Sequence, residues 1–195
     1  MPKESTFRPT SSWVYFGFIL AIEILVIATF LYAGKVEIAI TSTFNSIAIN
    51  VLFWIFVVHP KIVFTDAGIK IYNPFQISKI GWLIVEDFET RYSFAVITGN
   101  RKIRAWAATA PGRYGAKRTH PSDFKGTGFS DRIVISPSDS PRTDSGMAFV
   151  LATKRRDEAT KNGTANSELI RRIQWHNIVL TGFAVTILWI NVTQL

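Results

Sequence analysis

The sequence predicts a membrane protein of mixed α and β class, in which three apolar helices hold one water-soluble β module. Residues 13–58 contain only three charged side chains and residues 173–195 contain none, as expected of segments that cross a bilayer. Residues 59–175 carry 19 of the 22 Lys and Arg and 11 of the 14 Asp and Glu, so the net charge of +8 belongs to this part. Within residues 61–107, short apolar runs alternate with turn residues, which indicates antiparallel strands.

These patterns divide the chain into four parts. Residues 1–12 are a polar tail, and residues 13–58 contain two apolar segments that predict a transmembrane helical hairpin. Residues 59–165 form the predicted module, with a long loop at 108–146. Residues 166–195 are expected to form a helix that starts at a cap near Ser167, carries two arginines and continues into a third span.

Each apolar segment has the length that a bilayer requires. Residues 13–33 and 38–58 each provide 21 residues, and the third segment runs from 173 to about 192. About 20 residues of α-helix cross the hydrocarbon core. Trp and Tyr side chains stand near the ends of the first and third segments, as is typical of membrane interfaces.

Three polar residues in the first two spans are candidate intramembrane contacts. Glu23 is the only charge in its span, and Asn45 and Asn50 lie in the second span. A carboxylate near mid-membrane costs several kcal/mol unless it is neutralised, paired or turned away from lipid. Glu23 and Asn50 fall at similar depth in a hairpin, which favours a structural hydrogen bond to Asn50, Asn45 or a partner subunit. A proton or ion site at Glu23 is the alternative.

The module contains a hairpin at Gly99-Asn100, a two-residue turn between alternating strands. The register that this turn implies places three pairs opposite each other: Thr98 with Arg101, Val96 with Ile103, and Phe94 with Ala105. One face of the hairpin is then apolar. The residues expected in the module core are Ile69, Ile71, Trp82, Val85, Phe94, Val96 and Ile103.

Six short strands fit within residues 61–107, which predicts a small antiparallel barrel or sandwich. One of these strands is expected just after Gly81-Trp82. A further short strand is expected at 133–135, and the apolar run at 147–153 predicts a last strand.

Three motifs in this module resemble a known family. They are Asp66-x-Gly68-Ile69-x-Ile71-x-Asn73-Pro74, then Ile80-x-Trp82-x-x-Val85, then Arg101-x-Ile103-x-Ala105. Together they resemble the bacterial pleckstrin-homology-type (PH-like) domain of small actinobacterial membrane proteins, of the low-molecular-weight antigen type. The resemblance covers about residues 60–110. It implies a split β-barrel of two packed sheets closed by a helix, used for binding and not for catalysis. The basic inositide pocket of eukaryotic relatives does not carry over, because the first turn is Asp66-Ala67-Gly68.

The loop at 108–146 is rich in Pro, Ser, Thr and Gly and is expected to be long and mobile. Its candidate contacts with an anionic surface are Arg113, Lys117, Arg118 and Lys125. Each cation near an anionic bilayer contributes about 1 kcal/mol. A positively charged loop that remains in solvent is the alternative.

The residues predict no catalytic, cofactor or metal site. There is no cysteine, and the three histidines, His59, His120 and His176, are too far apart in sequence for the usual spacing of zinc ligands. No phosphate loop or nucleophile motif occurs. The aromatic residues are interpreted as core or interface residues, so a nucleic-acid partner is not expected.

Basic residues flank the predicted cytoplasmic ends of the spans, so the positive-inside bias places the amino terminus and the module in the cytoplasm and the carboxyl terminus outside. The leading hypothesis is a non-catalytic, membrane-anchored scaffold whose module binds a protein or an anionic lipid. Its membrane would be the cell (inner) membrane. The alternative is an accessory subunit of a larger membrane assembly, such as a respiratory or cell-envelope complex. A proton-coupled transporter that uses Glu23 is the third hypothesis.

Overall fold

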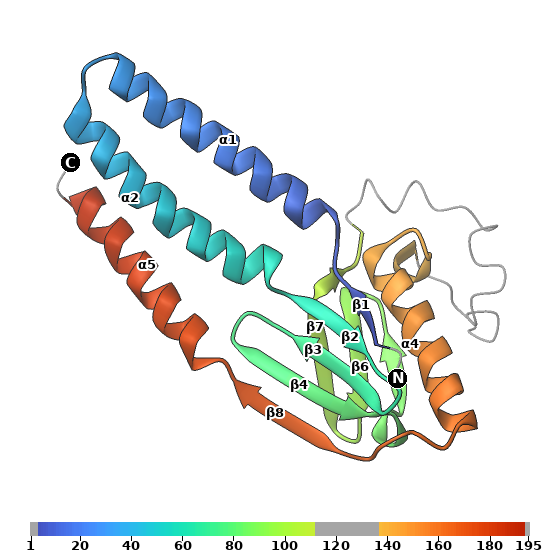
Figure 1. The fold of residues 1–195 in the computed structure, drawn as a ribbon. Coiled ribbons are helices and arrows are strands. Elements are labelled where there is room, and N and C mark those ends of the chain that lie inside the picture. The colour runs from blue at the N-terminus through green and yellow to red at the C-terminus, as the bar shows by residue number, and fades with distance from the viewer. Residues whose placement is uncertain (1–3, 112–136, 194–195) are drawn as a thin grey trace. The chain divides into compact units, whose positions relative to one another are not determined.

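The computed structural model describes residues 4–111 and 137–193 (Figure 1). The chain forms two compact units. Met1–Pro9 and Pro60–Ile173 make a β module, and Thr10–His59 and Gln174–Leu195 make a helical unit. Each unit is therefore assembled from stretches that are distant in the sequence.

The helical unit contains three long apolar helices. They are α1 (Ser11–Tyr32), α2 (Val36–Phe53), which continues into the π-helical turn η1 (Trp54–Val58), and α5 (Trp175–Thr193). With α2 and η1 counted together, the helices have 22, 23 and 19 residues and are long and apolar enough to cross a membrane. Their bounds differ by at most two residues from the expected spans. The tight loop between α1 and α2 uses Gly34 at φ 71°, a conformation that favours glycine.

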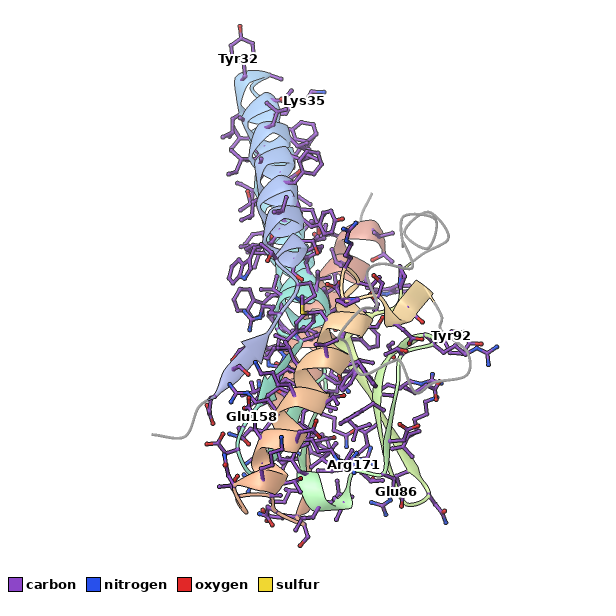
Figure 2. The ribbon with its side chains drawn as sticks, turned by 90° about the vertical axis from the view of Figure 1, so that its right-hand side faces the viewer. Tyr32, Lys35, Glu86, Tyr92, Glu158 and Arg171 are labelled. Carbon is purple, nitrogen blue, oxygen red and sulfur yellow. The ribbon has the colours of Figure 1, made fainter. Side chains whose placement is uncertain are left out.

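Helix α2 packs against both α1 and α5. Near one end of the hairpin, Trp13 and Trp54 meet edge to face at 5.6 Å between ring centroids, and Phe16 stacks on Phe53 at 6.0 Å. Such aromatic pairs stabilise a contact beyond the area they bury. At the loop end, Tyr32 is 97% exposed and Lys35 stands beside the turn (Figure 2).

The β module contains two open antiparallel sheets. The larger, sheet A, has the order β1-β2-β3-β4-β8, and the smaller, sheet B, has the order β5-β6-β7. The strands of sheet A are β1 (Ser5–Phe7), β2 (Lys61–Phe64), β3 (Gly68–Tyr72), β4 (Gln76–Gly81) and β8 (Leu169–Ile173). Those of sheet B are β5 (Asp87–Glu89), β6 (Ser93–Thr98) and β7 (Arg101–Thr109). In the described residues no strand ladder joins the two sheets, so barrel closure stays a prediction.

Two strands of sheet A lie outside the region where strands were predicted. Ser5–Phe7 lies in the predicted tail and pairs with β2. Leu169–Ile173 was expected to be helical, and this prediction is wrong, because the segment pairs antiparallel with β4 along its whole length. Ile170 and Ile173 are β-branched, which favours an extended strand where a neighbouring edge is available.

The hairpin register is confirmed near the turn and fails further from it. Thr98 pairs with Arg101 and Val96 with Ile103, but the register shifts between Ser93 and Ala95. Phe94 therefore does not pair with Ala105 as predicted. The extra residues are on β7, which bulges, and a bulge increases local twist.

Residues 147–153 form part of a helix, so the strand predicted there is wrong. Helix α4 (Asp144–Lys161) begins where the Thr143 hydroxyl accepts a hydrogen bond from Gly146 N at 3.1 Å, an N-cap. Burial raises the pKa of the Asp144 carboxyl in its first turn. The buried face of α4 has helical spacing and packs on β2, β6 and β7. It includes Ala148, Phe149, Ala152 and Ala159.

Two short 3₁₀ turns also belong to the described part of the module. The first, η2 (Trp82–Ile84), lies where a strand was expected, and the strand β5 begins only at Asp87. The second, η4 (Pro137–Asp139), is tied to the module by a buried hydrogen bond from the Thr90 hydroxyl to Asp139.

The core of the module lies between the two sheets and α4. Trp82 is 1% exposed, and its Nε1 donates to Thr65 O at 2.9 Å. Phe88 stacks on Phe94 and meets Phe149 edge to face. The structure buries every residue that the sequence suggested for the core: Ile69, Ile71, Trp82, Val85, Phe94, Val96 and Ile103.

Candidate functional site

The helical unit brings Glu23 and Asn50 together. Asn50 Nδ2 donates to a carboxylate oxygen of Glu23 and also to Ser46 O on its own helix at 2.8 Å. Both residues are half-buried. The hydrogen bond links α1 to α2, so Glu23 has a polar partner within a segment that is otherwise apolar.

A second amide contact links α2 to α5. Asn191 Nδ2 donates to Asn45 Oδ1 at 2.8 Å. Asn45 is therefore not a partner of Glu23; it pairs with a residue 146 positions away in the sequence. The three helices are thus joined by two interhelical hydrogen bonds, a common way for membrane helices to associate.

A groove runs along the surface where these helices meet. It has a volume of about 610 Å³ and an apolar lining that includes Phe16, Trp54 and Leu180. Asn50 also lines it, and its Oδ1 is buried without a hydrogen-bond partner in the described residues. The groove therefore combines an apolar wall with one unsatisfied acceptor.

Basic side chains collect on the outer face of sheet A, opposite the core. Lys70 lies between two buried isoleucines of β3 and Lys79 between two buried residues of β4, so both point away from the core. The two lysines are directly paired in the ladder. Like charges opposite one another are destabilising, and the Glu4 carboxylate, 3.0 Å from Lys70 Nζ, offsets this repulsion.

A second row crosses the same face closer to the strand ends that lead to the helices. It runs Lys61, Tyr72, Ile77, Arg172 from strand to neighbouring strand. Lys61 Nζ lies 4.8 Å from the centre of the Tyr72 ring, a cation–π contact. Lys61 follows the last residue of η1 by three positions, and Arg172 precedes the first residue of α5 by three. Both cations are therefore within three residues of an apolar helix along the chain.

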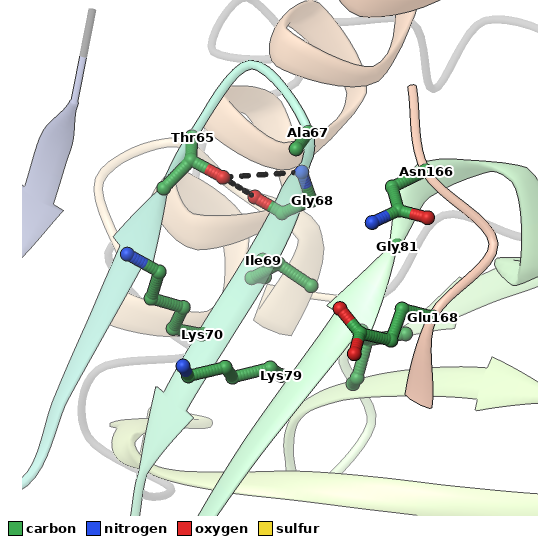
Figure 3. Close-up of a pocket in the computed structure, with 10 residues that line it drawn as sticks. Thr65, Ala67, Gly68, Ile69, Lys70, Lys79, Gly81, Asn166 and Glu168 are labelled. Atoms are coloured by element: carbon green, nitrogen blue, oxygen red, sulfur yellow. Dashed lines mark hydrogen bonds between the residues drawn. The ribbon is translucent and has the colours of Figure 1, made fainter. Parts of the chain in front are cut away.

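A small pocket of about 210 Å³ opens beside the turn between β2 and β3 (Figure 3). The Thr65 hydroxyl donates to Gly68 O at 2.7 Å and accepts from Gly68 N at 3.1 Å, which closes this turn. Lys70 and Lys79 line the pocket, but Lys70 is paired with Glu4 at 3.0 Å and Glu168 lines the same pocket. Its charges are mixed, which suits a multiply charged anion poorly.

Backbone contacts build the rim of this pocket. Gly81 N donates to Glu168 O at 2.8 Å, and Asn166 N donates to Ala67 O at 3.0 Å. A Cβ on Gly81 would lie 2.0 Å from Asn166 O. The close crossing of β4 by the segment before β8 therefore requires glycine at position 81.

The candidate cations of the long loop, Arg113, Lys117, Arg118 and Lys125, lie outside the described residues. Among residues 4–111 and 137–193, no group of three or more His, Asp or Glu side chains is placed to hold a metal ion. His120 falls in the stretch that is not described.

Sequence reasoning missed the cations of the outer face, Lys61, Lys79 and Arg172. They are far apart in the sequence, and the row appears only once β8 is placed beside β4. Alternation along each strand was the available signal, since Lys70 and Lys79 each separate two buried residues.

Comparison with models of known protein families finds no match, and comparisons with curated proteins and with solved structures find no similar protein.

Proposed function

We propose that this chain is a non-catalytic, membrane-anchored binding protein, and that its β module holds anionic lipid headgroups against the outer face of sheet A. One observation carries the proposal. Lys61, Lys79 and Arg172 lie on one face of a sheet whose strands lead directly into apolar helices. Cations next to an anionic leaflet each contribute about 1 kcal/mol of attraction.

The orientation and the family relationship are part of the same proposal. The positive-inside bias supports a module in the cytoplasm, beneath the leaflet that carries anionic lipid. Two antiparallel sheets packed with a helix are compatible with a PH-like split barrel. The basic turn that eukaryotic PH domains use is not needed here, because the cations lie on the strands.

The test compares how strongly the full chain restricts the motion of anionic and of zwitterionic lipids. The protein is placed in nanodiscs of phosphatidylcholine and phosphatidylglycerol, and spin-labelled lipids report the fraction that is motionally restricted. We expect preferential restriction of phosphatidylglycerol at low salt, reduced at high salt because ions screen the attraction. In the triple variant Lys61→Gln, Lys79→Gln, Arg172→Gln, the preference for phosphatidylglycerol should fall. Each cation removed should lower it by at most about fivefold, which corresponds to about 1 kcal/mol.

The matched control removes the same charges elsewhere. Arg91, Lys154 and Lys161 are exposed side chains of the module that lie outside sheet A. Their replacement by Gln should leave the lipid preference near that of the wild type. An equal loss of lipid preference in both triple variants would mean that only the net charge of the module matters. That result would contradict the proposal that the outer face of sheet A binds the lipid.

A second candidate function rests on the groove of the helical unit. An apolar groove with the unsatisfied Asn50 Oδ1 also suits an accessory subunit whose helices pack against a larger membrane assembly. Purification from native membranes in mild detergent separates the two proposals. A stoichiometric complex supports the accessory subunit, and a lone chain that keeps its lipid preference supports the first proposal.

A further inference from the structure

The two open sheets of the β module leave a seam at their edges. Strand β8 is the last strand of sheet A and β7 is the last strand of sheet B, and no ladder joins them in the described residues. A pocket of about 470 Å³ lies at this seam. Its lining comes from three places in the sequence: Asn73, Gln76, Arg101, Lys102, Ile103, Arg104 and Arg171.

Two arginines stand on the inward faces of the strands that border the seam. Arg101 is two residues from the buried Ile103, so both lie on the same face of β7. Arg171 pairs across the ladder with Ser78, which is 1% exposed and faces the core. Inward positions of a sandwich are normally apolar, whereas at this open edge of the core two exposed arginines occupy them.

The amide of Asn73 fixes the geometry of this pocket. Asn73 Nδ2 donates to Arg104 O at 2.9 Å, and Asn73 Oδ1 accepts from Trp106 N at 2.8 Å. The side chain therefore pairs with β7 as a neighbouring strand would. These two hydrogen bonds join the turn between β3 and β4 of sheet A to β7 of sheet B. They therefore fix the distance between the two walls of the pocket.

The polar groups of the pocket are arranged as donors. Arg171 donates to Gln76 Oε1 at 2.9 Å. Because arginine can only donate, the side-chain atom of Gln76 that faces Arg171 must be the oxygen. The amide nitrogen of Gln76 is then left as a further donor. Arg101 and Arg171 form no ion pair within the described residues, and no carboxylate lines the pocket. Lys102 differs, because Glu89 neutralises it.

We infer that this seam pocket binds a phosphate group. Two guanidinium groups and an amide donor suit a ligand that offers several acceptor oxygens, and arginine binds phosphate through paired hydrogen bonds. A bound phosphate would also relieve the repulsion between two unpaired cations at the edge of the core. The group could belong to a soluble phosphate compound or to a lipid headgroup, since Arg171 precedes the first residue of α5 by four positions.

This inference does not depend on the proposed lipid face. The outer face uses Lys61, Lys79 and Arg172, whereas the seam pocket uses Arg171 from the opposite face of sheet A and Arg101 from sheet B. Loss of lipid preference in the outer-face variant and loss of phosphate binding in a seam variant are therefore separate results.

The experiment uses the full chain and has two arms. In the first, inorganic phosphate is titrated by calorimetry into the protein in phosphatidylcholine nanodiscs. In the second, phosphatidic acid is added to the nanodisc, and hydrogen exchange of β7 and β8 amides is measured. The double variant Arg101→Gln, Arg171→Gln should weaken binding at least tenfold. The variant Arg101→Lys, Arg171→Lys keeps the charge and loses the planar fork, so it should bind with intermediate affinity.

The control Arg91→Gln, Lys154→Gln removes two exposed charges outside the pocket and should bind as the wild type does. Phosphate binding that the seam variant loses supports the inference and identifies a soluble source. Protection by phosphatidic acid alone, lost in the same variant, supports it with a lipid source. No saturable effect in either arm, or equal losses in seam and control variants, would overturn the inference.

Discussion

The helical unit and the β module distribute polar and apolar side chains in opposite ways. In the helices the large apolar residues are mostly exposed, including Phe18, Leu25 and Phe183, while Glu23 and Asn50 turn toward each other. In the module most large apolar residues are buried, as Trp82 and Phe64 are, and no lysine or arginine among the described residues is buried.

This difference is compatible with one unit in lipid and the other in water. Exposed apolar surface of this extent is unfavourable in water and is expected in lipid. An inward-facing hydrogen bond between side chains is correspondingly valuable where no water competes for it. The module follows the usual rule for a protein in water, so each unit should respond differently to the loss of a buried contact.

The largest expected effect is in the module. Trp82→Ala removes a fully buried ring and the hydrogen bond from Nε1 to Thr65 O. Replacing a buried Phe or Trp by Ala lowers the free energy of unfolding by about 3–5 kcal/mol. Hydrogen exchange of β3 and β4 amides in the full chain, followed through a urea titration, measures this loss.

Trp106 provides the matched control because it is 54% exposed. Trp106→Ala should change the free energy of unfolding of the module by about 0.5 kcal/mol or less, as surface substitutions usually do. Similar losses for the two tryptophans would mean that the core is not centred on Trp82.

A smaller effect is expected in the helical unit. A double-mutant cycle with Glu23→Leu and Asn50→Leu isolates the hydrogen bond between α1 and α2. Hydrogen bonds between membrane helices average about 0.6 kcal/mol and reach about 1.7 kcal/mol, so the coupling should fall in this range. Unfolding by steric trapping in bicelles gives the four free energies.

Thr29 serves as the control for this cycle, since its hydroxyl bonds to Leu25 O on its own helix. Pairing Thr29→Ala with Asn50→Leu should give no coupling. Zero coupling between Glu23 and Asn50 would remove the structural role proposed for this carboxylate and would leave a proton or ion site as its explanation.

Much of this contrast could be predicted from local sequence. Hydrophobic length locates the three long apolar helices to within two residues, because a predicted span requires a nearly continuous run of apolar side chains. Alternation and turn residues locate five of the six strands of residues 61–107, whereas the strand expected just after Trp82 begins only at Asp87. Val96 pairs with Ile103 as the Gly99-Asn100 turn predicts. Hydrophobic length, alternation and turn residues are all patterns of residues that are close together in the sequence.

The errors lie where long-range pairing decides the outcome. Residues 169–173 become a strand because the edge of β4 is free to pair, and a distant partner gives no local signal. Residues 147–153 are apolar enough for a strand, but the cap at Thr143 and the helical spacing of the buried alanines decide for α4. The seam pocket combines β4, β7 and β8, so no single stretch of sequence could predict it.

The most direct test of the two-solvent account is the accessibility of single cysteines in sealed membrane vesicles. The chain has no cysteine, so Lys154→Cys in the module and Lys35→Cys in the loop between α1 and α2 report without background. A membrane-impermeant maleimide should label position 154 only from the cytoplasmic side and position 35 only from the other side. Labelling of both positions from the same side would contradict the account.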